Sequence, residues 1–499
     1  MTLQSTFSRF LFAFSWIGCF ALVLAGCDST GNGGAADPDA FEVTVENVGS
    51  GSPALKSGAF TPADVIDDNN NVPPLEPGEA FQFTFTAGPD ELPGTGMKLS
   101  FATMFIQSND LYYAFEPGGL SLFENGTPIG QNSPRDVTAQ VGLYDAGTEG
   151  DQTPGSGSDQ APRQSALDTG PDGEGSVVEV VDEDGDGRLE NDDFSYPATE
   201  DVVKVTVESA SHEDGGVAFT VTIRNQGATV NGKPVPLSPG SYAVHWDQNP
   251  MNGNDVTYPG HSPGEAAGGG IEAIAEDGRP NGALDGDSGS PAGNHVQTLQ
   301  DITGVTVPLS PGAVAVHSDE VSLFETGAQA SGGIEAIAED GRPNGAVEGD
   351  AGSPASNLVA DLTGADGIES IDAFGSGPIT PGNSVTFTVN ATPGDRLSLA
   401  TMYIQSNDLF YATPQEGIAL FDNNDQPINR TINVGLYDAG TEGDQEPGVG
   451  LDQAPRQSEL NTGPNGEGSV TQVSGSDDGF SYPAPSDVIE VSVRPASSQ

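Results

Sequence analysis

The chain has 499 residues, enough for two or three domains, and a formal net charge of −58 from 15 Lys and Arg against 73 Asp and Glu. A surface this acidic repels nucleic acid and anionic lipid, so nucleic-acid binding is excluded. Both cysteines fall within the first 27 residues, which leaves no disulfide framework for the rest of the chain. We interpret the acidity mainly as halophilic adaptation to concentrated salt, with a few specific calcium sites among the acids.

Residues 1–26 predict a lipoprotein signal peptide. Arg9 precedes an apolar run over residues 10–24, and the run ends in Leu-Ala-Gly-Cys27. That ending resembles the lipobox of bacterial lipoproteins, which implies cleavage before Cys27 and lipidation of this residue. We therefore expect an extracytoplasmic, membrane-anchored bacterial lipoprotein of the outer membrane or cell surface, with residues 27–40 as a flexible tether. An uncleaved membrane anchor is the alternative.

Alternating apolar residues then predict strands, from Phe41–Val48 to Val488–Val493. The 68 Gly and 38 Pro, without a long helical pattern, indicate many short strands and turns. Such strands can build sandwich cores, so we expect an all-β chain with long Gly- and Asp-rich loops.

One segment, Val141–Gln152, returns unchanged as Val434–Gln445, an offset of 434 − 141 = 293. A period near 300 residues is too long for a solenoid, so we interpret the chain as two copies of one domain in tandem. We place the boundary near residue 212, between domains over 41–211 and 212–499. The second domain contains an internal duplication, over 237–291 and 309–354.

Taken in order, motifs of the second copy resemble the spondin N-terminal domain. The resemblance is good over residues 215–497 and partial over 41–210, where the His and Ala-Glu-Asp-Gly portion is missing, so we expect the first domain to be abbreviated. It implies two antiparallel C2-like β-sandwiches with calcium held by acidic loops at one end. The family occurs in matrix and adhesion proteins and carries no known chemistry. The motifs are Pro308–Gly312, Ala315–His317, Leu323–Gly327, Ile334–Gly341, Leu397–Met402, Ser406–Asp408 and Asp438–Glu442.

The resemblance also implies the calcium ligands. They are Asp110, Asp145 and Glu149 in the first copy, and Asp408, Asp438 and Glu442 in the second. Glu stands where the animal relatives have Asp in the last position, one methylene longer. Calcium takes six to eight hard oxygen ligands, which carboxylates in Gly-bearing loops supply. Turn capping by Asp is the alternative.

A further calcium loop follows from spacing alone, over residues 182–193 of the first copy. Gly187 occupies position 6 of this loop, and the stretch is typical of an EF-hand-type loop with Asp where Glu is usual at position 12. The flanks look like strand and turn rather than paired helices, and an acidic surface hairpin is the alternative. The expected ligands are Asp182, Asp184, Asp186, the carbonyl of Arg188, Glu190 and Asp193.

No catalytic constellation emerges. Gly286–Pro291 is similar to the nucleophile motif of chymotrypsin-like proteases, but its internal twin carries Ala351 in place of the Ser. His245 and His317 each end an apolar run and are expected to be half-buried structural residues rather than ligands. Adjacent acids such as Glu276 and Asp277 do not face each other across a substrate.

We therefore expect a non-enzymatic, calcium-binding surface lipoprotein that acts in adhesion or extracellular-matrix binding. Its partners would be the membrane, through Cys27, and a cell-surface or matrix polysaccharide or protein. A secreted hydrolase and a purely structural envelope protein without a specific ligand are the alternatives.

Overall fold

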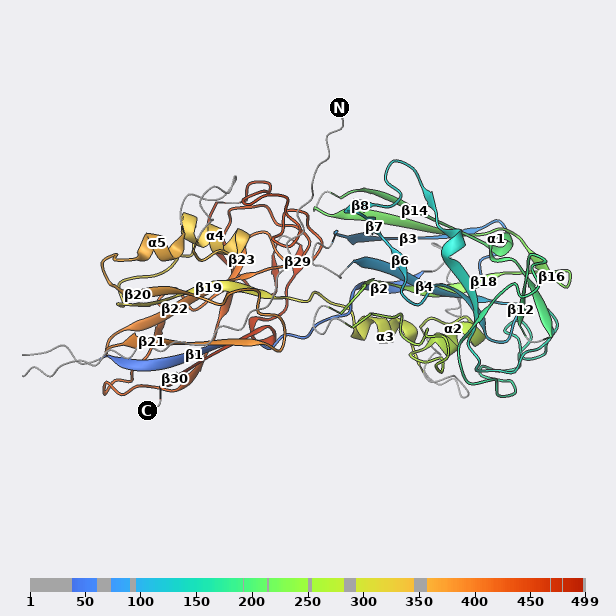
Figure 1. Cartoon of the computed structure of the whole chain (residues 1–499), viewed down its shortest axis with the longest axis horizontal. Helices are drawn as coiled ribbons and strands as arrows, with labels where there is room; N and C mark the ends of the chain where they lie inside the picture. Colours follow the sequence, from blue (N-terminus) through green and yellow to red (C-terminus); the bar gives the residue numbers. More distant parts are fainter. Residues whose placement is uncertain are drawn as a thin grey trace, which may run out of the picture. The chain divides into compact units, whose positions relative to one another are not determined.

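The computed structural model describes residues 38–60, 73–89, 96–191, 193–212, 215–249, 254–281, 293–344, 357–466, 468–477 and 479–496. The expected signal peptide, Cys27 and the protease-like segment at 286–291 lie outside these residues. The regular secondary structure of the described chain is mostly antiparallel strand, as the alternating sequence pattern predicts, and the all-β class is confirmed (Figure 1).

A seven-stranded and a four-stranded sheet form what we call the first sandwich. In spatial order the larger sheet contains β11 (Val178–Val180), β10 (Val141–Asp145), β5 (Leu111–Phe115), β4 (Met97–Phe105), β18 (Leu237–Trp246) and β2 (Ala54–Phe60), with β6 (Leu120–Ser121) beside β4. The smaller sheet contains β3 (Ala80–Ala87), β15 (Val217–Asn225), β14 (Val203–Ser211) and β9 (Arg135–Asp136).

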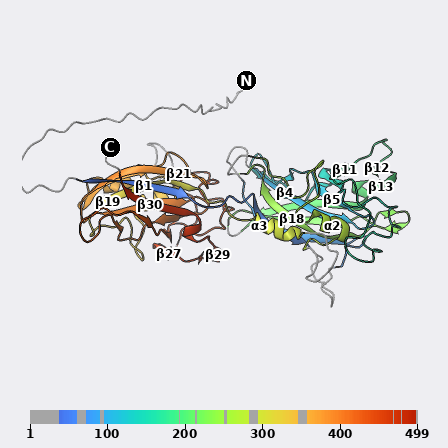
Figure 2. The same ribbon diagram turned by 90° about the horizontal axis from the view of Figure 1, so that it is seen from below.

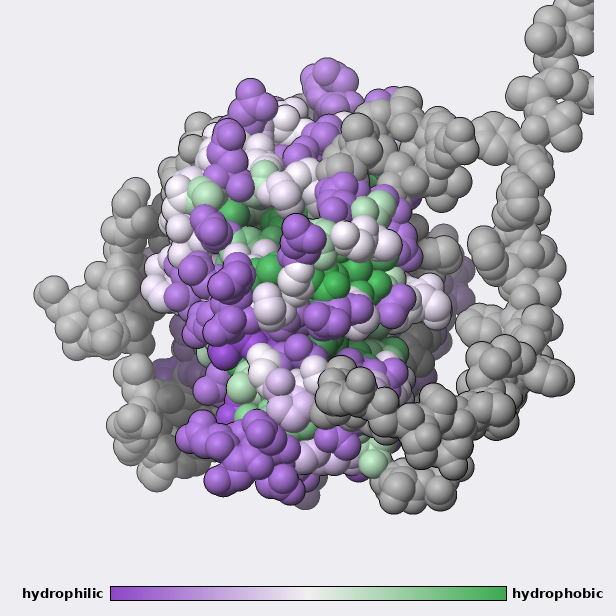
Figure 3. All heavy atoms as spheres, turned by 90° about the vertical axis from the view of Figure 1, so that its left-hand side faces the viewer, coloured by the Kyte–Doolittle hydropathy of each residue, from purple (hydrophilic) through white to green (hydrophobic). Residues whose placement is uncertain are grey.

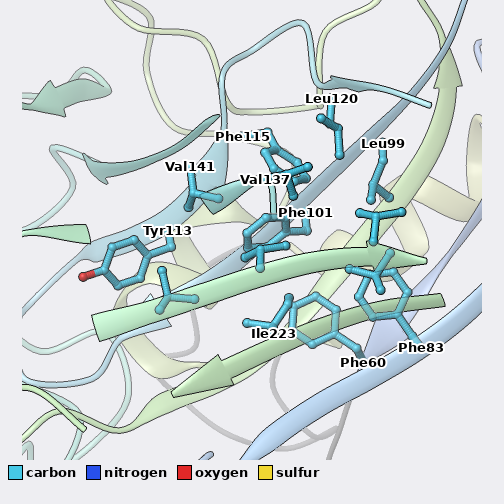
Figure 4. Packing of buried hydrophobic residues seen from close by; sticks show 14 of the residues in the cluster. Phe60, Phe83, Leu99, Phe101, Tyr113, Phe115, Leu120, Val137, Val141 and Ile223 are labelled. Atoms are coloured by element: carbon cyan, nitrogen blue, oxygen red, sulfur yellow. The ribbon is translucent and has the colours of Figure 1, made fainter. Parts of the chain in front are cut away.

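The core of the first sandwich lies between these two sheets. Alternate residues of β3 point inward, so Phe81, Phe83 and Phe85 are all buried. Phe83 stacks on Phe60 of the facing sheet, with ring centroids 5.2 Å apart. Figure 4 shows Phe60 and Phe83 close together, with further apolar side chains such as Phe101 nearby. Burial of these aromatic side chains is the main stabilising contribution.

The second sandwich repeats this arrangement. Its larger sheet contains β20 (Ile368–Phe374), β19 (Leu309–His317), β22 (Arg396–Tyr403), β23 (Leu409–Ala412), β26 (Gly435–Asp438) and β27 (Thr471–Val473), with β24 (Ile418–Ala419) beside β22. Its smaller sheet contains β21 (Ser384–Ala391), β1 (Asp39–Asn47), β30 (Ile489–Pro495) and β25 (Arg430–Ile432). One buried apolar cluster joins the two sheets.

Strand pairing crosses the boundary expected near residue 212. The first strand of the chain, β1, pairs with β21 and β30 of the second copy. Conversely β15 and β18, which follow residue 212, pair with β14, β3, β4 and β2. The segment 237–278 therefore supplies the first sandwich with the His and Ala-Glu-Asp-Gly portion that the first copy lacks. The first of the two duplicated segments completes the first sandwich, and the second completes the second sandwich.

Four short helices cover the outer faces of the larger sheets, which the sequence analysis did not predict. Apolar residues of α2 (Ile271–Asp277) and α3 (His295–Asp301) pack with the outward side chains of the first sandwich. Those of α4 (Gly332–Asp340) and α5 (Leu358–Leu362) pack on the second. Figure 2 shows α2 and α3 beside β18 and β4. None of the helices in the described ranges is long and apolar enough to cross a membrane.

The remaining elements are short and lie in the connections. They are β7 (Phe123–Glu124), β8 (Thr127–Pro128), β12 (Arg188–Asn191), β13 (Phe194–Pro197), β16 (Thr229–Val230), β17 (Lys233–Pro234), β28 (Ser476–Asp477), β29 (Phe480–Ser481), α1 (Thr199–Val202) and the 3-10 turns η1 (Thr138–Gln140) and η2 (Pro485–Asp487). Figure 3 shows hydrophilic residues over most of the described surface on one side, in keeping with the acidic composition.

Candidate metal centres

A buried acidic cluster lies at one end of the larger sheet of the first sandwich. Asp110 precedes β5 and Asp145 ends the neighbouring β10, where it is paired with Leu111. One carboxylate oxygen each of Asp110, Asp145 and Asp151 lie within 4.8 Å of one another. Asp110 and Asp145 are buried and Asp151 is half-buried. Two of the expected ligands, Asp110 and Asp145, are thus brought together, and Asp151 is a third that the sequence analysis missed.

Asp110 fixes the loop that carries the other acids. Its Oδ2 accepts hydrogen bonds from the backbone N–H groups of Thr148 at 2.8 Å and Glu149 at 2.9 Å. Its Oδ1 is buried and has no hydrogen-bond partner among the described residues. Burial and the charges of Asp145 and Asp151 raise the pKa of Asp110 well above its usual value. A cation beside Oδ1 would relieve this cost, so the residues present suit a calcium ion.

The amide of Asn191 links the other two carboxylates. Its Nδ2 donates to Asp145 Oδ2 at 2.5 Å and to Asp151 Oδ2 at 2.6 Å. Asn191 ends β12, shortly after the acidic loop at 182–187, and pairs with Phe194 of β13. The hairpin of β12 and β13 therefore contributes directly to the buried cluster.

The second sandwich repeats the loop geometry. Asp408 Oδ2 accepts from the N–H groups of Thr441 at 2.7 Å and Glu442 at 2.9 Å, and Asp438 Oδ1 accepts from Gly440 at 2.5 Å. Asp408 Oδ1 is again buried without a hydrogen-bond partner among the described residues. However, no third acidic or histidine ligand joins this pair within the same reach in the part of the chain that the structure describes.

Glu149 belongs to a different group from the one expected. One of its carboxylate oxygens lies within 4.8 Å of one oxygen each of Asp168 and Glu276. Glu276 ends the helix α2, which follows residue 212 in the sequence. Sequence spacing could not bring these residues together, because the contact depends on β18 and α2 joining the first sandwich. The repeated Ala-Glu-Asp-Gly motif was a usable signal for Glu276.

The EF-hand-type loop is an exposed acidic turn before the hairpin of β12 and β13. Ligand atoms of four of its acids lie within 4.8 Å of one another. Asp182 accepts from the N–H of Gly185 at 2.6 Å and of Gly187 at 3.0 Å, which curls the loop around this carboxylate. Asp193 lies in the turn of the hairpin and does not join the group. The four are Asp182, Asp184, Asp186 and Glu190.

The histidines are more buried than expected. His245 and His317 are 1% and 0% exposed. Nδ1 of His245 donates to the carbonyl of Trp246 at 2.8 Å, which leaves Nε2 to accept from the Ser100 hydroxyl at 3.0 Å. Burial lowers the pKa of His245 to about 4, so its imidazole is neutral and structural.

A scan against protein-family models matched none, and a search of curated proteins gave no match.

Proposed function

We propose that this protein is a calcium-stabilised, non-enzymatic lipoprotein of the bacterial cell surface with spondin-like sandwiches, acting in adhesion to a polysaccharide or matrix protein. The observation that carries the calcium part is the buried cluster of Asp110, Asp145 and Asp151, in which Asp110 Oδ1 has no hydrogen-bond partner among the described residues. Three carboxylates gathered beside a loop whose backbone N–H groups bind Asp110 suit a hard cation that prefers oxygen.

Calcium would act here as a structural ion. It would neutralise charge between β5 and β10 and hold the loop at 145–151, which follows β10 at one end of the larger sheet. The anchor follows from the Cys27 motif, and the adhesion role follows from the spondin resemblance.

The test is calorimetry of chelator-treated protein with calcium at matched ionic strength. We expect saturable binding that Asp110→Asn reduces by one ion, with a calcium-dependent rise in melting temperature that the variant loses. If neither wild-type binding nor a shift in melting temperature is observed, calcium is not part of the function. Calcium-dependent, saturable binding to polysaccharide-coated or matrix-coated surfaces tests the adhesion role.

A further inference from the structure

The first sandwich carries a second group of carboxylates, distinct from the Asp110 cluster. One oxygen each of Glu149, Asp168 and Glu276 lie within 4.8 Å of one another. The three residues come from two loops and the end of α2. Glu149 and Glu276 are 4% and 1% exposed, whereas Asp168 is exposed and opens the group to solvent.

Several oxygens in this group are buried without a hydrogen-bond partner among the described residues. They are Oε1 of Glu149, Oε2 of Glu276 and the amide Oδ1 of Asn109. Asn109 is 1% exposed, and its Nδ2 donates to Glu149 Oε2 at 3.2 Å. Buried oxygens in this state cost free energy unless a cation or a shared proton satisfies them.

The surrounding charges favour a positive occupant. The charges that act most strongly on Glu149 and Glu276 are all acidic. Burial and these charges raise the pKa of Glu149 to about 7 and that of Glu276 to about 8. The acids concerned are Asp159, Asp168, Glu272 and Asp277, together with Glu149 acting on Glu276.

The backbone at residues 168–170 closes over the group. A Cβ atom at position 170 would stand 2.5 Å from the carboxylate carbon of Glu149, so a side chain there would displace this carboxylate. Asp168 adopts a left-handed conformation, with φ of 50°. The loop is therefore shaped to place its one carboxylate beside the two buried ones.

We propose that Glu149, Glu276 and Asp168 form a second cation site, which takes a hard divalent ion such as calcium. Carboxylates are the preferred ligands of such ions, and two buried glutamates need the charge. The site uses none of the carboxylates of the Asp110 cluster and does not rest on the proposed function.

The second sandwich provides a matched control. Glu442 and Glu339 form the corresponding buried pair, at 6% and 1% exposed. Asn461 stands at the position of Asp168, and its Nδ2 donates to Glu335 at 3.2 Å. No three-ligand group forms there among the described residues. Without a third carboxylate at the mouth, this pair offers a metal ion one ligand fewer than the group in the first sandwich.

Calcium stoichiometry and affinity test the proposal, measured by calorimetry on chelator-treated protein at physiological ionic strength, where diffuse attraction to the acidic surface is screened. We expect Glu276→Gln to remove one calcium ion and Asp168→Asn to weaken one site at least about ten-fold. Glu339→Gln should leave the count unchanged, and Asn461→Asp should add one ion. Asp168→Asn changes an exposed side chain, so misfolding does not obscure its result.

Unchanged calcium counts and affinities in both Glu276→Gln and Asp168→Asn would overturn the proposal. Asp110→Asn separates this result from the proposed function. An ion lost in Asp110→Asn but not in Glu276→Gln contradicts the second site alone. An ion lost in Glu276→Gln but not in Asp110→Asn supports the second site and contradicts the Asp110 cluster.

Discussion

Asp110 and Asp408 occupy equivalent positions in the two sandwiches, and each uses one carboxylate oxygen to hold the following loop. The other oxygen of each is buried with no hydrogen-bond partner among the described residues. The first sandwich has in addition the amide of Asn191, which links Asp145 to Asp151, and the described residues show no such amide between Asp438 and Asp444. At the scale of single residues, the two acidic clusters are therefore unequal.

The variant Asn191→Ala tests this difference. Without the amide, the carboxylates of Asp145 and Asp151 are no longer held together, so their repulsion must be overcome when calcium binds. We expect calcium affinity at the first cluster to fall about ten-fold, roughly 1.4 kcal/mol. Calorimetry measures it, and an exposed-loop variant such as Asn132→Ala is the control. An unchanged affinity would show that Asn191 has no part in the site.

The raised pKa of Glu339 predicts that the stability of the protein depends on pH. Burial, followed by the charges of Glu335, Asp340 and Asp408, raises its pKa to about 8 in the folded protein, against 4.5 in the unfolded chain. The folded state thus holds a proton that the unfolded state releases, and stability falls as pH rises from 4.5 through 8. Glu339→Gln should remove this loss and stabilise calcium-free protein at pH 9 by the order of 2 kcal/mol, after allowance for solvent screening. Urea denaturation at pH 5 and pH 9 measures it, and a variant as pH-sensitive as wild type contradicts it.

The lowered pKa of His261 predicts the opposite dependence of stability on pH. Its Nε2 donates to the carbonyl of Phe115 at 2.9 Å, and its Nδ1 accepts from the Tyr112 hydroxyl at 2.8 Å. Burial lowers its pKa to about 4 in the folded state, against 6.5 unfolded, so stability is lost as pH falls from 6.5 through 4. His261→Gln should reduce the acid-induced loss by up to about 3 kcal/mol. The slope of melting temperature between pH 7 and pH 4 is the readout, and His212→Gln, at a histidine that is only half-buried, is the control.

At the scale of elements, the repeated Leu-Ser-Pro-Gly motif has a structural role. It opens β18 and β19, and each strand has an irregular register between its Leu and its Gly. A Cβ atom on Gly312 would lie 2.4 Å from both the carbonyl oxygen of Ala400 and the ring of Phe374. Glycine is needed here because the backbone of β19 approaches its neighbours too closely for any side chain.

The variant Gly312→Ala therefore tests how much the close approach of β19 to its neighbours contributes to stability. The added methyl group must displace a backbone carbonyl, and we expect a loss of about 1–3 kcal/mol in the free energy of unfolding. The matched control is Gly377→Ala, where no atom stands within 4 Å of the new Cβ atom. Urea denaturation of both variants measures the difference. Equal stability would mean that β19 shifts to accept the methyl group at no cost.

At the scale of the whole molecule, each sandwich contains strands from both sequence copies. Strand β1 is hydrogen-bonded on both edges inside the second sandwich, between β21 and β30. In the first sandwich β15 fills the corresponding position, between β3 and β14. Both strands alternate in the same way, with Phe41, Val43 and Val45 matching Phe219, Val221 and Ile223 in burial. The alternating pattern of apolar residues in β1 and β15 would therefore fit either strand to either sheet.

Deletion of residues 39–47 tests this arrangement. It would leave β21 and β30 as unpaired edges and remove Phe41, Val43 and Val45 from the second core, so we expect that sandwich to be strongly destabilised. Hydrogen exchange of the backbone amides should accelerate in β21 and β30 and stay near wild type in β3 and β14. Faster exchange in β3 and β14 instead would assign β1 to the first sandwich.

The sequence by itself determined the strands, since period-two alternation, as in β3, specifies a half-buried strand wherever it packs. It also determined the duplicated loops, and the resemblance of their motifs grouped Asp110 with Asp145, which the pairing of β5 with β10 brings together. Only the tertiary structure decided which copy each strand completes, because near-identical strands compete for the same positions. It likewise decided that Glu149 meets Glu276 and that Asp151 takes the third position beside Asp110. Those contacts join segments more than a hundred residues apart or depend on side-chain direction, and no local spacing encodes either.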